Sequence, residues 1–191
     1  MKYLLPFIII LIFVAESKAQ TGSLQIGPVA TFFGKHQNAF GGELIGNVSI
    51  QKNISAGAGI QILSFNAEPN LYIPVFATFK LLLPANKIEY FFHVDPGYGI
   101  HNYNSSIFFY GTNNSFHYDF KNTGGFYLGT GAGMRLKSKA SPYINLQYTL
   151  YHLKFVTNMT DLNESKEYIY TNKLFTAGMT ITAGIWLHAN K

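Results

Sequence analysis

His93 and Asp95 are the neighbouring residues of this sequence best suited to chemistry. They lie two positions apart, so in an extended strand both side chains point to the same face. An imidazole and a carboxylate arranged in this way form a hydrogen-bonded pair, and they can also supply two ligands of a metal ion. The sequence offers no third ligand beside them. It therefore favours the hydrogen-bonded pair and predicts no metal site.

A nucleophilic hydrolase needs a serine, a histidine and a carboxylate close together. His152, Glu164 and Ser165 come nearest to this set, with His152 at the end of a predicted strand and the other two in the loop that follows. No serine directly follows His152, and the sequence contains no G-x-S-x-G, P-loop or H-E-x-x-H motif. We therefore expect no catalysis and no cofactor. A lipid-modifying enzyme is an alternative, which substitution of His152 or Ser165 would test.

The segments that must position these residues alternate apolar and polar residues with a period of two. This pattern is typical of β-strands with two different faces. In residues 143–152, for example, Ile144, Leu146 and Leu150 share one face and Asn145 and Gln147 share the other. The pattern predicts eight strands, at residues 24–33, 39–51, 54–63, 71–83, 87–100, 125–137, 143–152 and 174–187.

The connections between these strands alternate in length. Tight turns are predicted near residues 51–53, 84–86 and 138–141, whereas residues 101–123 and 153–173 form long polar connections. Short turns at one end and longer loops at the other are typical of outer-membrane barrels. We therefore predict an all-β fold, an eight-stranded antiparallel up-and-down transmembrane β-barrel. The two long connections are expected to extend the strands as β-hairpins above the membrane, and they are the expected place for ligand binding.

The composition indicates which face of the barrel is outside. Only 12% of the 191 residues are charged, about half the usual share of a soluble domain, and a water-facing barrel would carry many more on its surface. The apolar faces are therefore predicted to contact lipid and the polar faces to fill the lumen. A soluble secreted barrel that binds a lipophilic ligand is the alternative with the faces reversed.

The few charged residues of the predicted strands fall on the polar face. We expect them to form a charge network in the lumen, in which Arg135 and Lys80 meet Glu43 and Glu89, because an unpaired buried charge is costly. The expected network consists of Glu43, Lys80, Glu89, His93, Asp95 and Arg135. We interpret it as a structural plug, with a gate or proton path as the alternative.

The amino terminus carries the features of an export signal. A basic start at Lys2 precedes an apolar run at residues 3–15, and the small residues Ser17 and Ala19 precede Gln20. The run is too short for a membrane-spanning helix, so residues 1–19 are predicted to be a cleaved signal peptide and residues 20–191 the barrel domain. The chain has no cysteine and a formal net charge of +5. The absence of cysteine excludes disulfides, and the scattered basic residues do not favour nucleic-acid binding.

Several segments of residues 20–187 resemble a known group, the small outer-membrane β-barrel proteins of Bacteroidetes-type bacteria, of the porin-like class. The resemblance rests on the predicted signal peptide and on the segments at residues 72–80, 96–99, 124–135 and 183–186. It implies a barrel in the outer membrane of a Gram-negative cell, mostly without an assigned activity. Such barrels often end on an aromatic residue that the assembly machinery reads, whereas this chain continues for four residues past Leu187.

These observations together predict a non-enzymatic outer-membrane barrel with a structural or surface-binding role and a largely plugged lumen. A narrow small-solute porin is the alternative that needs an open water path, which eight strands disfavour. The expected partners are outer-membrane lipid, periplasmic chaperones and the barrel assembly machinery during export, and an extracellular ligand at residues 101–123 and 153–173.

Overall fold

The structure, a computed structural model, describes residues 22–33, 38–66, 71–101, 103–110, 115–122, 124–138, 140–161 and 166–188. The predicted signal peptide, residues 1–19, lies outside these ranges. Eight strands form the barrel, and their bounds are β1 Gly22–Phe32, β2 Asn38–Gln51, β3 Ile54–Phe65, β4 Leu71–Pro84, β5 Ile88–His101, β8 Gly125–Leu136, β9 Ala140–Asp161 and β10 Lys166–His188. Two further strands, β6 Tyr103–Tyr110 and β7 Ser115–Asn122, lie outside it.

The eight barrel strands pair in chain order and close into a ring. β1 pairs with β2 on one side and with β10 on the other, and β10 also pairs with β9. All of the strand pairs are antiparallel. The predicted eight-stranded antiparallel up-and-down barrel is therefore confirmed. In the described part of the chain, no helix has both the length and the hydropathy to cross a membrane.

The two faces of the strands follow the alternation in the sequence. In β9, Asn145 and Gln147 are buried in the lumen, whereas Leu146 and Tyr148 between and beyond them are exposed on the outside. The barrel wall consists of β1 to β5, β8, and the parts of β9 and β10 up to His152 and Phe175. It contains five Asp, Glu, Lys and Arg residues, and all five point inward. The outer wall is consequently apolar, as lipid contact requires.

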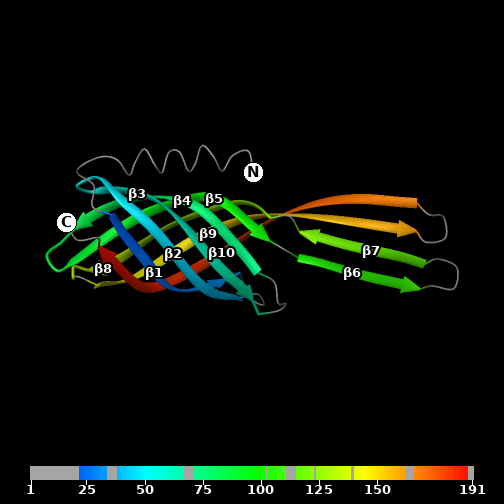
Figure 1. Cartoon of the computed structure of the whole chain (residues 1–191), viewed down its shortest axis with the longest axis horizontal. Helices are drawn as coiled ribbons and strands as arrows, with labels where there is room; N and C mark the ends of the chain where they lie inside the picture. The colour runs from blue at the N-terminus through cyan, green and yellow to red at the C-terminus, as the bar shows by residue number, and fades with distance from the viewer. Residues whose placement is uncertain are drawn as a thin grey trace.

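The sheet extends beyond one end of the barrel as a four-stranded part, which we call the outer sheet (Figure 1). It consists of β6, β7 and the parts of β9 and β10 beyond His152 and Phe175, in the order β10-β9-β7-β6. β9 and β10 run from the barrel into the outer sheet without a break in their pairing, from Leu187 opposite Ala140 to Lys166 opposite Asp161. The long connections thus form β-hairpins, as the sequence led us to expect.

Glycines of β8 create room inside the narrow lumen. A Cβ atom on Gly133 would lie 2.6 Å from the carbonyl oxygen of Ile144 and closer still to the Phe91 ring. A Cβ atom on Gly129 would meet the side-chain amide of Gln147 in the same way. Both contacts are closer than van der Waals packing allows, so these positions require glycine if the inner side chains are to keep their places.

We expect Gly133→Leu to lower the free energy of unfolding by about 1–3 kcal/mol, because the larger side chain overpacks the lumen. Urea titration of the folded barrel in detergent, followed by tryptophan fluorescence, measures this change. Ala132→Leu is the matched control, since Ala132 is the neighbouring residue on the exposed outer face. Equal stability of the two variants would contradict the packing described here.

Candidate functional site

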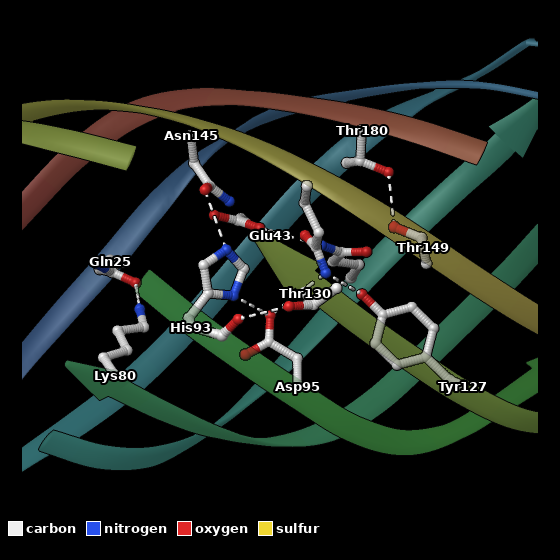
Figure 2. A network of polar contacts seen from close by, with 12 residues as sticks. Gln25, Glu43, Lys80, His93, Asp95, Tyr127, Thr130, Asn145, Thr149 and Thr180 are labelled. Atoms are coloured by element: carbon white, nitrogen blue, oxygen red, sulfur yellow. Dashed lines mark hydrogen bonds and ion pairs between the residues drawn. The ribbon is translucent and has the colours of Figure 1, made fainter. Parts of the chain in front are cut away.

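A network of polar side chains fills the middle of the barrel (Figure 2). The two ring nitrogens of His93 both have partners: Nδ1 lies 2.7 Å from Asp95 Oδ2, and Nε2 lies 3.0 Å from Asn145 Oδ1. Gln147 Nε2 lies 3.3 Å from the same Asp95 oxygen and donates to the hydroxyl of Tyr127 at 3.0 Å. Three strands, β5, β8 and β9, are thus joined across the lumen by one continuous chain of hydrogen bonds.

Glu43 and Lys80 occupy the same level of the lumen but have different partners. The carboxylate of Glu43 accepts hydrogen bonds from the Tyr143 hydroxyl at 2.7 Å and from Gln61 Nε2 at 3.1 Å. Lys80 donates to the side-chain oxygen of Gln25. Both charged side chains are almost completely buried, so these hydrogen bonds replace the water that the charges lose.

A second cluster closes the barrel at the end with the tight turns. Arg135 forms an ion pair with Glu89, with Nη2 and Nε at 2.5 Å and 2.6 Å from the same carboxylate oxygen. The guanidinium carbon lies 3.8 Å from the centroid of the buried Trp186 ring, and Lys80 Nζ lies 4.9 Å from the same ring. Arg135 Nη1 also lies 3.1 Å from His188 Nε2. Cation–π contacts of this kind are strongest where water is excluded.

Aromatic side chains close the opposite end of the lumen. Tyr72 and Tyr151 are buried with their ring centroids 4.9 Å apart, and Tyr151 packs on Phe33 at 5.0 Å and on Tyr127 at 5.6 Å. Between this aromatic layer and the Trp186 cluster, the cavity lined by the polar network measures ≈ 10 Å³. That volume accommodates about one water molecule.

The six residues predicted for the luminal network all lie inside the barrel, although their pairing differs in part from the expectation. Arg135 meets Glu89 as expected. Lys80 does not pair directly with Glu43, because both oxygens of Glu43 accept from neutral donors and Lys80 donates to Gln25.

Sequence reasoning missed the neutral partners of the charged groups. These partners are Gln25, Gln61, Tyr143, Asn145 and Gln147, and Tyr127 accepts a further hydrogen bond from Gln147. The signal that could have found them is that all of them occupy inward positions of the barrel strands.

The residues considered for catalysis are not assembled into a site by the described part of the structure. His152 packs its ring against Phe175, with the centroids 4.6 Å apart, and Glu164 and Ser165 lie outside the described residues. The described residues also contain no cluster of three or more His, Asp or Glu side chains arranged to hold a metal ion.

The outer sheet has two different faces, which follow from the register of its strands. One face, here called the aromatic face, contains Tyr118 opposite Met159 and Met159 opposite Tyr168 in a row across three strands. Phe116 and Tyr170 lie on the same face, at neighbouring rows. The residues of this face occupy the same side of β9 and β10 as the residues that point into the lumen. The aromatic face is therefore continuous with the aromatic end of the lumen.

The opposite face of the outer sheet, here called the polar face, continues the outer wall of the barrel. On it, Asp119 accepts a hydrogen bond from the Ser106 hydroxyl at 2.5 Å and lies 3.2 Å from His117 Nε2. The His117 ring stacks on Phe108 with the centroids 4.1 Å apart. The remaining described residues of the polar face include Lys121, Lys154, Asn158, Thr160, Glu167, Ile169, Thr171 and Lys173.

A closed eight-stranded antiparallel barrel with an apolar outer wall and a polar, filled lumen is the fold of the small outer-membrane β-barrels. The outer membrane protein AlkL, whose structure was determined by solid-state NMR in lipid bilayers, has a similar fold: the TM-score is 0.55 over 90% of each chain, at 10% sequence identity. The outer membrane protease OmpT from Escherichia coli gives a TM-score of 0.30 at 9% identity, over 89% of this chain and 96% of that one. This second likeness is too low to carry a conclusion.

Comparison of the amino-acid sequence with known families and curated proteins finds no match. No protein-family model matches the chain, and no curated protein does. The resemblance to the Bacteroidetes-type porin-like group therefore stays a prediction.

Proposed function

We propose that this protein is an integral outer-membrane barrel that neither conducts solutes nor catalyses a reaction, and that holds a binding sheet at the cell surface. The small space left between the side chains of the lumen supports this proposal. Aromatic layers at both ends enclose a hydrogen-bonded centre whose cavity measures only ≈ 10 Å³, so the barrel serves as a stable support and not as a pore.

The outer wall supports the placement in a membrane. On β10, the apolar outward positions extend from Leu187 to Phe175. Twelve residue steps of roughly 3.3 Å, tilted by about 45°, span roughly 28 Å along the barrel axis. This height matches the hydrocarbon thickness of a bilayer, about 30 Å. A soluble barrel with an apolar lumen would require the opposite orientation of these faces.

The aromatic face of the outer sheet is the surface that we assign to binding. Tyr168 and Tyr170 are exposed on it, and the row Tyr118, Met159 and Tyr168 provides a flat apolar strip on paired strands. Aromatic side chains on a rigid sheet supply a large contact area with little loss of side-chain freedom. A partner in the extracellular space is therefore the expected ligand of this strip.

Electrical recording across a planar bilayer tests the closed lumen. We expect no conductance steps after insertion of the purified barrel, with a general diffusion porin as the positive control in the same bilayer. Insertion is checked by reconstituting the same preparation into vesicles, where a folded barrel resists alkaline extraction and migrates differently on gels before and after boiling. Reproducible conductance steps from inserted protein would favour the narrow porin, and failure to enter vesicles would favour the soluble barrel.

A further inference from the structure

Lysine side chains lie where the outer sheet leaves the barrel, on the face that continues the outer wall. On β9 the first outward position beyond His152 is Lys154, and on β10 the first outward position beyond Phe175 is Lys173. His152 pairs with Phe175, and Lys154 pairs with Lys173 in the same register. The outer wall therefore changes from apolar to cationic at the same height on two neighbouring strands.

A third lysine lies beside this pair. Lys121 of β7 is opposite Val156 of β9, which is the next position after Lys154 on the same face. All three lysine side chains are exposed. We call these three residues, Lys121, Lys154 and Lys173, the lysine cluster.

The lysine cluster lacks an acidic partner among the described residues. Of the described carboxylates on the polar face, Asp119 is engaged with Ser106 and His117, and Glu167 lies opposite Thr160, nearer the tip of the sheet. Like charges placed directly opposite one another on paired strands are destabilising. An anion that binds between them would remove this repulsion.

The height of the lysine cluster relative to the apolar outer wall indicates which kind of anion binds there. The apolar outward positions of β10 span roughly 28 Å up to Phe175, so the next outward residue, Lys173, reaches the level of the lipid headgroups. Phosphate groups are the anions concentrated at that level, and basic residues beside a membrane surface attract them. The paired aromatic rings of His152 and Phe175, directly below the cluster, are suited to the interface between hydrocarbon and headgroups.

We propose that Lys121, Lys154 and Lys173 bind the phosphate groups of lipid headgroups in the outer leaflet and thereby hold the outer sheet in a fixed orientation on the membrane. This inference rests on the proposed function, because it requires the barrel to be embedded with the outer sheet outside. It adds a lipid ligand to a face that is separate from the aromatic binding face.

The test compares two double variants of the full-length mature protein, folded in neutral detergent. Lys154→Gln with Lys173→Gln removes two charges of the cluster, whereas Lys52→Gln with Lys87→Gln removes two exposed charges at the opposite, tight-turn end. Phosphorylated lipid A is titrated in mixed micelles, and its binding is followed by the rise in the thermal unfolding midpoint. We expect the first variant to bind lipid A about tenfold more weakly than wild type and the second to bind it unchanged.

Three outcomes decide the proposal. Stabilisation by lipid A but not by inorganic phosphate, lost only in the Lys154 and Lys173 variant, supports a headgroup site. Equal stabilisation by inorganic phosphate, an equal loss in the Lys52 and Lys87 variant, or no effect of lipid A on the folded barrel overturns it. Failure of the protein to insert into vesicles refutes the proposed function itself, and vesicle insertion is measured separately on the same preparation.

Discussion

Substitution of Arg135 by Met is expected to lower the free energy of unfolding of the barrel by about 3 kcal/mol. The Arg135 side chain is almost fully buried, and it forms the ion pair with Glu89 at 2.5 Å and covers the Trp186 ring at 3.8 Å. Methionine retains much of the packing volume but leaves the Glu89 carboxylate without its cation in a site shielded from water. Removal of one partner of a buried ion pair usually costs about 3–5 kcal/mol. We expect a loss at the lower limit of this range, because the pair lies near the tight-turn end of the barrel, where water is closer.

A double-mutant cycle separates the ion pair from the packing. Glu89→Gln alone and Arg135→Met with Glu89→Gln complete the cycle, and urea titration in detergent gives each free energy of unfolding. We expect the double variant to be more stable than the Arg135→Met variant, because the buried carboxylate is gone. Lys137→Met is the matched control two residues further along the chain, just past the end of β8, where the side chain is exposed, and it should change the stability little. If the effects of Arg135→Met and Glu89→Gln on the free energy of unfolding simply add, the two side chains do not stabilise the barrel through their interaction.

Substitution of Trp186 by Ala is expected to have the largest effect on stability, about 3–5 kcal/mol, because it leaves a large cavity in the buried cluster. The Trp186 ring is 1% exposed and packs against Phe91 at 5.6 Å and Tyr143 at 6.4 Å between ring centroids. The change also removes the ring on which Arg135 and Lys80 rest. Unfolding by urea, followed by the gel shift between unheated and boiled samples, measures the loss without relying on tryptophan fluorescence.

The Trp186→Ala variant also tests whether the lumen has more than one barrier. The polar network and the aromatic layer of Tyr72 and Tyr151 are in series with the Trp186 cluster, so we expect the folded variant to remain non-conducting in a planar bilayer. Trp186→Phe keeps an aromatic ring in place and should restore most of the lost stability. A variant that stays folded and conducts ions would show that Trp186 is the single barrier of the lumen.

The alternation of residue types predicted the barrel strands and their two faces, and the low share of charged residues was needed to decide which face points outward. Each inward charge, such as Arg135 or Asp95, could be assigned from its position in the strand, because a one-residue shift would place it in lipid. The pairing within the lumen was harder to predict. Lys80 binds Gln25 on β1 and Glu43 binds Tyr143 on β9, and such contacts across the ring depend on strand tilt and side-chain length, which the period of two does not encode.

The predicted strand bounds, which ended at residue 152 and began again at residue 174, were too short for β9 and β10, although the connection between these strands was expected to form a β-hairpin. Residues such as Asn158 and Asn172 have low strand propensity, so the local sequence resembles a loop. Cross-strand pairing stabilises them: β9 pairs with β10 throughout the outer sheet, and residues 155–161 of β9 also pair with β7. Strand structure there depends on cross-strand contacts that lie far apart in the chain.

The uninterrupted pairing of β9 with β10 has a thermodynamic consequence for the binding that we propose at the outer sheet. A ligand that binds to a flexible loop must first order it, and this loss of conformational entropy reduces the affinity. In the outer sheet, the backbone around Met159 and Tyr168 is already fixed by hydrogen bonds that continue into the barrel wall. Binding to this sheet therefore requires little ordering of the backbone, and the contact energy of a partner is available for affinity.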